Sequence, residues 1–119
     1  MRNCSADGDG GFYFNNPQST FAVAKQYNLP YLWVVMDNSG WSAVKEATLR
    51  MYADGEALAA KEFQASLAPN VDFCKVAESV GGHGESVSDP SALAGALQRA
   101  MAAVKAGKPA LVHVKIPAL

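Results

Sequence analysis

The chain has 119 residues, half of them hydrophobic, and a formal net charge of −1. This length suits one domain that buries roughly two-thirds of its unfolded surface. The composition excludes a disordered chain and a nucleic-acid binder that works through basic charge. The sequence has no apolar run of membrane-spanning length and no leader pattern, so we expect no membrane partner and a cytoplasmic location. Cys4 and Cys74 lie in no CxxC pair and are expected to be free thiols.

The first expected element is a helix that follows a glycine-bearing loop, Gly8-Asp9-Gly10-Gly11. Asn16-Pro17 indicates its start, because Asn can cap free amides and proline suits the first helical position. Apolar residues recur at helical spacing over residues 17–27, and Asn28-Leu29-Pro30 ends the helix. Residues 1–7 are polar and contain no β-branched residue, so they lack the composition of a buried strand.

Residues 31–36, Tyr-Leu-Trp-Val-Val-Met, form an unbroken apolar run of strand length. Such a run is typical of a strand buried on both faces of a parallel sheet. A second loop, Asp37-Asn38-Ser39-Gly40, follows directly, and ligands of open α/β sheets bind beyond the carboxyl ends of the strands. Residues 41–46 are expected to begin another helix, whose N-terminus would help to hold an anion. For Trp41, packing and ligand contact both stay open.

The next part of the chain predicts helices without clear chemistry. Residues 47–68 are rich in Ala, Glu, Lys and Leu and are expected to be partly helical, with a break at Asp54-Gly55. Residues 71–80 predict a short helix capped by Asp72, with an apolar stripe of Phe73, Val76, Ala77 and Val80. His83 follows in a glycine-bearing loop, and we interpret it as incidental.

The C-terminal part predicts a strand, a helix and a second strand. Residues 85–87 suit a short strand, and Ser88-Asp89-Pro90 indicates a helix start. The helix ends at Gly107 and has one apolar face, made by Leu93, Leu97, Ala100, Met101 and Val104. Residues 110–116 predict a strand whose alternation from His113 onward indicates either a sheet edge or one wetter face. We interpret His113 as a strand residue and not as a base.

These elements predict an open α/β domain with a mainly parallel sheet and helices on both faces, in a Rossmann-like three-layer arrangement. Two other kinds of site are excluded for the first loop. An EF-hand counted from Asp7 would need glycine at Phe12 and a bidentate glutamate at Gln18. A dinucleotide fingerprint counted from Gly8 has Tyr13 where the third glycine is required.

The order of these features resembles a known family. Gly8-Asp9-Gly10, with Asn38 at 29 positions after Asp9, resembles the Gly-Asp-Gly…Asn-Asn signature of thiamine diphosphate (TPP) enzymes. The resemblance is to the diphosphate-binding domain of the acetolactate synthase and 2-oxo-acid decarboxylase group. The Asn-Pro-Gln helix entry, Leu29-Pro30, the apolar strand and the C-terminal Gly-Lys-Pro all fall in the family's order. Asp37 stands where the family usually has its first Asn.

The resemblance implies a cofactor and a set of binding residues. In the family, the motif's Asp, its second Asn and a later backbone carbonyl bind the Mg²⁺ that bridges the two phosphates. The implied metal ligands are therefore Asp9, Asn38 and Gly40, and the implied cofactor-binding residues are Gly8, Asp9, Gly10, Gly11, Asn38, Gly40, Trp41 and Ser42. Mg²⁺ prefers such hard oxygen donors, together with phosphate oxygens and water. Glycines also let backbone amides approach a diphosphate closely. No residue of the chain is expected to be catalytic.

For the parent enzyme, the resemblance implies addition of the TPP ylide to a 2-oxo acid, loss of CO₂ and transfer of the acyl carbanion to a proton or a second carbonyl. Val44 stands where decarboxylases of the family often carry a catalytic Glu, and it is apolar as in many acetolactate synthases. The Glu that activates the cofactor belongs to a pyrimidine-binding domain of the same or a partner subunit. That domain is the expected partner, in an expected homo-oligomer.

The family pattern also requires a strand before Gly8. Because residues 1–7 lack strand composition, we expect the chain to begin inside a domain, as a truncated piece of a longer enzyme. The sheet would then lose a central member, and Asp9 would lose the support that aims it at Asn38. Two alternatives stay open: a non-catalytic module that binds a phosphorylated ligand, and a structural fragment that binds nothing.

Overall fold

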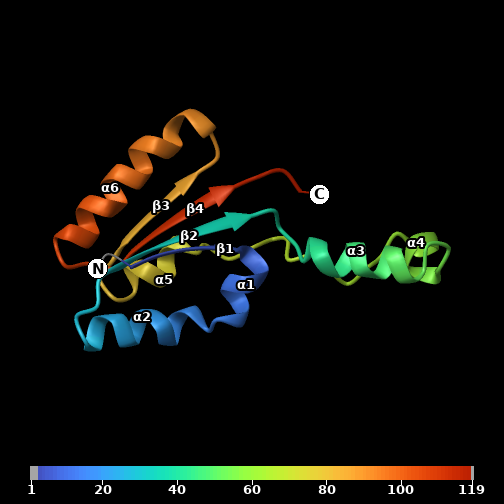
Figure 1. Ribbon diagram of the computed structural model, residues 1–119, viewed down its shortest axis with the longest axis horizontal. Helices are drawn as coiled ribbons and strands as arrows, with labels where there is room; N and C mark the ends of the chain where they lie inside the picture. Colours follow the sequence, from blue (N-terminus) through green and yellow to red (C-terminus); the bar gives the residue numbers. More distant parts are fainter. Residues whose placement is uncertain (1–2, 119) are drawn as a thin grey trace.

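The computed structural model describes residues 3–118. Its centre is an all-parallel sheet with the strand order β1-β2-β4-β3. The four strands are β1 (Asn3–Gly8), β2 (Tyr31–Asp37), β3 (His83–Val87) and β4 (Ala110–Lys115). Helices lie on both faces of this sheet (Figure 1), which confirms the predicted fold class.

The helices fall into three groups. Helices α1 (Asp9–Phe14), α2 (Pro17–Gln26) and α5 (Cys74–Glu78) cover one face, and α6 (Leu93–Lys105) covers part of the other (Figure 1). Helices α3 (Ser42–Met51) and α4 (Glu56–Ala60) extend beyond the carboxyl edge of the sheet as an arm. The predicted helix over 17–27 and the predicted break at Asp54-Gly55 are confirmed.

Two different cores hold the layers together. The core under α1, α2 and α5 is aromatic, with the Phe12 ring 4.8 Å from Trp33 and 4.9 Å from Phe73 between centroids. The core under α6 uses small residues, since Ala96 and Ala100 face the sheet and are fully buried. Small side chains let α6 approach the strands closely, whereas packed aromatic rings fix α1 against β2. The first core therefore sets the position of α1, which begins at Asp9.

The prediction that no strand precedes Gly8 is wrong. Residues 3–8 form β1, which pairs with β2 in the register Asn3↔Tyr31 to Gly8↔Met36. Cys4, Ser5 and Ala6 are exposed, because β1 lies at the sheet edge and needs only one hydrogen-bonded neighbour. Backbone pairing can hold such a strand without the β-branched side chains of a buried one, so composition alone misled the prediction. Met1 and Arg2 lie outside the described residues.

The predicted strand over residues 110–116 is confirmed as β4, but of the two interpretations of its alternation, the sheet edge is wrong. β4 lies between β2 and β3, and its residues from Ala110 to His113 are buried. The polar character from His113 onward arises because the strand approaches the carboxyl edge of the sheet, where Lys115 is exposed. The pattern therefore marks the end of a central strand that faces the candidate site.

Three local predictions had different outcomes. Asn16 occupies the N-cap position of α2, but its φ is 45° and its side chain makes no capping bond, so that role is wrong. Asp72 accepts a hydrogen bond from the Cys74 amide at 3.0 Å, but the N-cap position of α5 is Phe73, one residue later than predicted. His83 begins β3 instead of lying in a loop, and its Nε2 is 3.2 Å from Glu85 Oε2.

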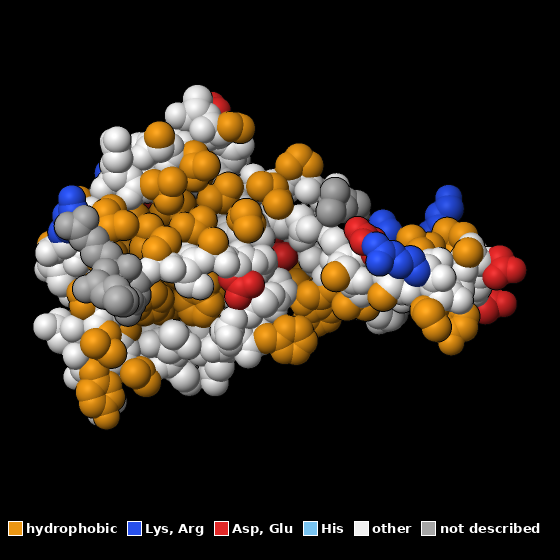
Figure 2. Space-filling view, viewed as in Figure 1, with side chains coloured by type: hydrophobic (Ala, Val, Ile, Leu, Met, Phe, Trp, Pro, Cys, Tyr) orange, Lys and Arg blue, Asp and Glu red, His pale blue; other side chains and the backbone are white. Residues whose placement is uncertain are grey.

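Hydrophobic side chains gather on the sheet face between α2 and α6 (Figure 2). Met36 and Ile116 remain 44% and 42% exposed.

In the part of the chain that the structure describes, no helix is both long enough and apolar enough to span a bilayer. Cys4 and Cys74 are free thiols, as predicted.

An ion pair between Arg99 and Glu85 connects α6 to β3 and gives a test of the fold. The Arg99 Nε donates to Glu85 Oε2 at 3.1 Å, and this hydrogen bond, with a smaller contribution from His83, lowers the pKa of Glu85. A lowered folded-state pKa stabilises the fold above the unfolded-state pKa, and the stabilisation disappears as the pH falls through the folded-state pKa. We expect Arg99→Ala to lower the urea midpoint modestly at pH 7, with the difference shrinking in acid. Equal differences at neutral and acid pH, or the same profile in the control Gln98→Ala, would contradict this.

Candidate functional site

The two glycine-bearing loops meet at the carboxyl edge of the sheet. β1 leads directly into α1 at Asp9, and the neighbouring parallel strand β2 ends at Asp37. An open hollow of about 390 Å³ lies between these strand ends. All eight residues implied as cofactor ligands line it, namely Gly8, Asp9, Gly10, Gly11, Asn38, Gly40, Trp41 and Ser42. The fold therefore brings the predicted set together, and what these residues bind stays a prediction.

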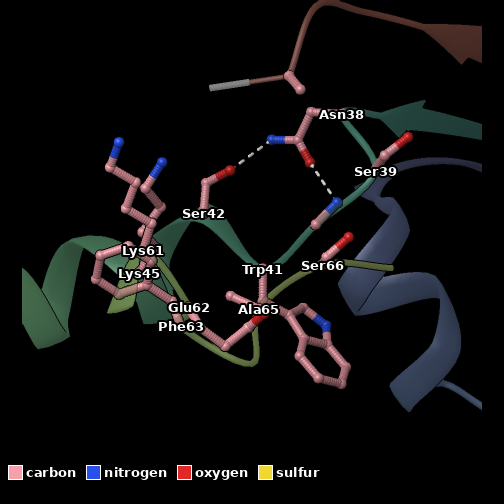
Figure 3. Close-up of a pocket in the computed structure, with 12 residues that line it drawn as sticks. Asn38, Ser39, Trp41, Ser42, Lys45, Lys61, Glu62, Phe63, Ala65 and Ser66 are labelled. Atoms are coloured by element: carbon pink, nitrogen blue, oxygen red, sulfur yellow. Dashed lines mark hydrogen bonds between the residues drawn. The ribbon is translucent and has the colours of Figure 1, made fainter. Parts of the chain in front are cut away.

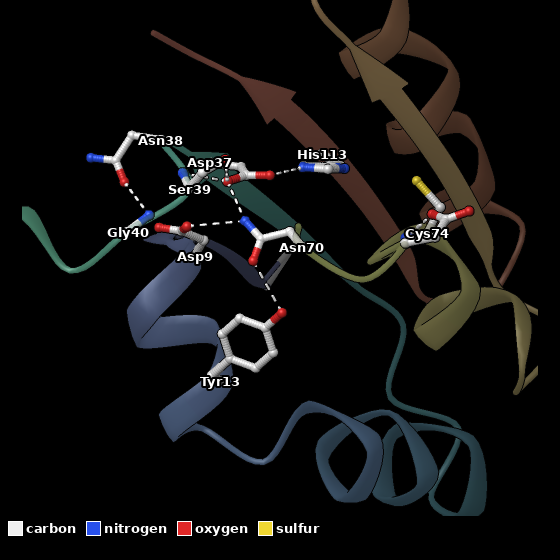
Figure 4. A network of polar contacts seen from close by, with 10 residues as sticks. Asp9, Tyr13, Asp37, Asn38, Ser39, Gly40, Asn70, Cys74 and His113 are labelled. Atoms are coloured by element: carbon white, nitrogen blue, oxygen red, sulfur yellow. Dashed lines mark hydrogen bonds and ion pairs between the residues drawn. The ribbon is translucent and has the colours of Figure 1, made fainter. Parts of the chain in front are cut away.

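Two carboxyl groups are buried at this edge and share one amide. Asp9 is 2% exposed and Asp37 is 5% exposed. The Asn70 Nδ2 donates to Asp37 Oδ1 at 2.6 Å and to Asp9 Oδ2 at 3.2 Å (Figure 4). The Asn70 Oδ1 accepts from the Tyr13 hydroxyl at 3.2 Å. Asn70 thus connects the first loop, the second loop and α1.

His113 completes the environment of Asp37. Its Nε2 lies 2.7 Å from Asp37 Oδ2, and its ring meets Phe73 edge-on with 4.8 Å between centroids. The Ser39 amide donates to Asp37 Oδ1 at 2.7 Å. Asp37 is therefore bound by groups of β4, of its own loop and of the segment before α5, which explains how a carboxylate is accommodated where the family usually has Asn.

The two carboxyls differ in their electrostatics. Burial raises the pKa of Asp9, and the adjacent Asp37 raises it further, while Asn70 opposes the rise. Burial acts in the same direction on Asp37, but hydrogen bonds from His113 and the Ser39 amide outweigh it and lower the pKa of Asp37. The hydrogen bonds to Asp37 therefore outweigh the effect of its burial, whereas those to Asp9, from Asn70 and the Gly10 backbone, do not.

The second loop is held by a segment that returns from the arm. The Trp41 amide donates to the Ala65 carbonyl at 2.8 Å, and the Leu67 amide donates to the Ser39 carbonyl at 2.9 Å. Gly40 and Ser66 form an antiparallel bridge between these bonds. We call residues 65–70 the return segment; part of it lies against the loop in Figure 3. A Cβ at Gly40 would lie 2.8 Å from the Ala65 carbonyl oxygen, so this pairing requires glycine.

The Asn38 side chain makes its hydrogen bonds within the second loop and with the start of α3. Its Oδ1 accepts from the Gly40 amide at 3.3 Å, and its Nδ2 donates to Ser42 Oγ at 2.8 Å. Since a carboxamide oxygen has two lone pairs, Oδ1 retains the capacity to bind a cation. The side chain is therefore oriented by its own loop before any ligand arrives.

Gly10 is required by the packing of Trp41. A Cβ at Gly10 would lie 2.1 Å from Trp41 Cδ1. The Trp41 ring also stacks on Phe14, with 5.8 Å between centroids, and its Nε1 is buried without a partner among the described residues. These contacts support the packing interpretation of Trp41, which also lines the hollow.

The donor set fits a hard divalent cation. No cluster of three or more His, Cys, Asp and Glu side chains suited to a metal is found within residues 3–118. Asp9, Asn38 and Gly40 all line the hollow instead, and their oxygen-bearing groups are a carboxylate, a carboxamide and a backbone carbonyl. This is a set suited to Mg²⁺ with phosphate oxygens. A cation there would also compensate the buried charge of Asp9.

Sequence reasoning missed two residues of this site. Asn70 is 61 positions from Asp9 and 33 from Asp37, so only the folded chain brings them together. His113 was recognised as a strand residue, but its pairing with Asp37 depends on β4 lying beside β2. A signal existed for His113 alone, since a polar residue at the carboxyl end of an apolar strand points to a ligand edge.

Comparison with known proteins agrees with this geometry. Residues 2–114 match the family model described as "Thiamine pyrophosphate enzyme, C-terminal TPP binding domain". The chain belongs to this family. A probable acetolactate synthase of Mycobacterium bovis and the acetolactate synthase large subunit IlvG of Mycobacterium tuberculosis are each 35% identical to it over 107 residues. The match covers 90% of this chain and 17% of each relative, so the chain corresponds to the TPP-binding domain of much longer acetolactate synthase-like proteins.

Solved structures support the same fold. This TPP-binding domain aligns over 100% of its length with a thiamine diphosphate-dependent 4-hydroxybenzoylformate decarboxylase from Rhodococcus jostii RHA1, with a TM-score of 0.78 and 21% identity. It aligns over 98% of its length with a benzoylformate decarboxylase from Polynucleobacter necessarius, with a TM-score of 0.73 and 16% identity. Both alignments cover 20% of the longer chain.

The buried carboxyl of Asp9 should destabilise the cation-free domain. Because its pKa is raised on folding, the stability of the fold decreases as the pH rises from the unfolded-state pKa through the folded-state pKa. Asp9→Asn keeps an acceptor for Asn70 and removes the charge, so we expect a gain on the order of 1 kcal/mol at pH 7 in EDTA, measured by urea unfolding. The gain should vanish in acid, where the wild-type carboxyl is protonated.

Asp54→Asn is the matched control, since Asp54 is exposed in the arm. A lower stability of Asp9→Asn in EDTA at pH 7 would contradict this account of Asp9.

Gly10→Ala should disturb the hollow through Trp41. The added methyl group would overlap the indole, so the ring must move away from Phe14. We expect a shift of the tryptophan emission maximum and a loss of about 1–3 kcal/mol in stability, as for other overpacked sites. Gly81→Ala is a control at a glycine with no neighbour within 4 Å, although its φ of 80° carries a strain cost of its own. Emission unchanged in Gly10→Ala would show that Trp41 does not pack against Gly10.

Proposed function

We propose that this domain binds Mg²⁺ and the diphosphate of TPP for an enzyme that acts on 2-oxo acids. The observation that carries the proposal is the convergence of the Asp9 carboxyl, the Asn38 carboxamide and Gly40 on one hollow at the carboxyl edge of the sheet. Asp9 there is buried, and its hydrogen bonds do not offset the effects of burial and of the adjacent Asp37, which favours a cation beside it. The glycines of the first loop leave room for phosphate oxygens to approach backbone amides.

Each group of residues has a separate task in this proposal. When bound, TPP supplies the carbon–carbon bond chemistry of 2-oxo-acid decarboxylation or carboligation. Asp9, Asn38 and the Gly40 carbonyl bind the Mg²⁺, and the Ser42 hydroxyl fixes the Asn38 amide. Trp41, which stacks on Phe14, excludes water from one side of the hollow. The chain orients the cofactor, and no residue in it is assigned to proton transfer.

The proposed reaction class is acetolactate synthase-like. The two curated relatives at 35% identity are named as acetolactate synthases, one of them as probable. Val44, which lines the hollow, is apolar at the position where the family's decarboxylases often have a Glu. In the cytoplasm, the domain would act together with a pyrimidine-binding domain of the same or a partner subunit, in a homo-oligomer.

Calorimetric titration of the purified chain with TPP tests the proposal. We expect saturable binding that requires Mg²⁺ and that falls by at least about 100-fold in Asp9→Ala, since a charged metal ligand is lost. Asp54→Ala, at an exposed arm residue, should bind like the wild type. Binding that is independent of Mg²⁺, or retained by Asp9→Ala, would contradict the site. No binding at all would favour a structural fragment.

The isolated chain should not turn over substrate. A domain that only binds and orients TPP lacks the group that activates it, so we expect no CO₂ release from pyruvate in the presence of Mg²⁺ and TPP. Measured release above the rate with free TPP would show that the chain is a complete catalyst. TPP binding without CO₂ release matches both a domain of a larger enzyme and a binding module. Addition of a separately expressed pyrimidine-binding domain should then give turnover only if the chain is a domain of a larger enzyme.

A further inference from the structure

Asn70 is placed to control the geometry of the proposed cation site. Its amide nitrogen donates to Asp37 Oδ1 at 2.6 Å and to Asp9 Oδ2 at 3.2 Å, so both donor hydrogens are directed at carboxyl oxygens. Its amide oxygen accepts from the Tyr13 hydroxyl at 3.2 Å. Because carboxylates accept and the Tyr13 hydroxyl donates, the amide has one orientation that satisfies all three partners.

We propose that Asn70 is a positioning residue that holds the Asp9 carboxylate in place to bind the cation. This inference rests on the proposed function of Asp9. Two buried carboxyls of like charge repel each other, and a neutral amide between them fixes the distance and the rotamer without adding charge. Without that amide, the Asp9 carboxyl would lose its hydrogen bond to Asn70, and nothing there would offset its repulsion by Asp37.

The backbone around Asn70 supports this role. Asn70 ends the return segment, whose residues Ala65 to Leu67 pair with the second loop from Ser39 to Trp41. The same short segment therefore positions two parts of the site: the backbone of the loop that carries Asn38 and Gly40, and the side chain of Asp9. Figure 4 shows the Asn70 amide directed at the carboxyls of both loops from one side.

Tyr13 acts through Asn70. Its ring packs against Phe73, with 5.5 Å between centroids, and its hydroxyl reaches the Asn70 amide oxygen. Removing only the hydroxyl leaves the aromatic packing intact, so Tyr13→Phe loosens the amide without removing it. This gives a second and milder variant of the same interaction.

The test uses Mn²⁺ as a probe for Mg²⁺ in the presence of TPP, because electron paramagnetic resonance reports both the affinity of Mn²⁺ and the symmetry of its ligand shell. We expect Asn70→Ala to weaken Mn²⁺ binding about tenfold and Tyr13→Phe about threefold, with broadened lines for the ion that still binds. The double variant should bind no more weakly than Asn70→Ala alone, because Tyr13 acts only through Asn70. Asp54→Ala, at an exposed arm residue outside the site, should leave affinity and spectrum unchanged.

Two results would overturn this inference and leave the proposed function standing. One is wild-type affinity and line shape in Asn70→Ala. The other is additive losses of affinity in the double variant, which would show that each residue only supports the fold. If Asn70→Ala does not fold, the Tyr13→Phe affinity decides, and a value equal to wild type refutes the role. Absence of Mn²⁺ binding by the wild-type chain would overturn the proposed function together with this inference, so the two failures are distinguishable.

Discussion

The burial of two carboxyl groups at one edge of the sheet is the constraint on which the rest of this structure depends. Buried charge is costly unless it is paired and hydrogen-bonded. The protein compensates Asp37 with His113 and the Ser39 amide, and it shares Asn70 between Asp37 and Asp9. Asp9 is left with burial as its dominant influence, which raises its pKa. Under the proposed function, a cation in the hollow would offset this cost, which would connect the buried carboxyls to the binding of the TPP diphosphate.

The scaffold is arranged so that distant segments meet at this edge. β1 is a polar edge strand, yet its pairing with β2 places Asp9 beside the end of that strand. The return segment then brings Asn70 back from the arm made by α3 and α4, after pairing with the loop that contains Gly40. The aromatic core beneath α1 fixes the helix that carries Tyr13. The aromatic core thus lies on the face of the sheet that carries α1, where the side chains of Asp9 and Tyr13 must be held in place.

Much of the fold followed from local patterns, whereas the interactions within the site did not. The apolar run over 31–36, the proline-started helix at Pro17 and the helix ending near Gly107 were predictable because period and punctuation are local signals. β1 was missed because an edge strand is held by backbone hydrogen bonds that leave little trace in composition. Asn70 and the pairing of His113 were missed because both depend on long-range contacts, and the polar end of the β4 sequence indicates a ligand edge without identifying Asp37 as the partner of His113.

The most direct test of this account is a crystal structure of the chain with Mn²⁺ and TPP, using the anomalous signal of the metal to locate it. The account predicts one strong peak in contact with an Asp9 carboxylate oxygen, Asn38 Oδ1 and the Gly40 carbonyl, at about 2.1 Å from each, with Asn70 still bonded to Asp9. A peak that lies away from Asp9, or a diphosphate bound without metal in the hollow, would contradict it.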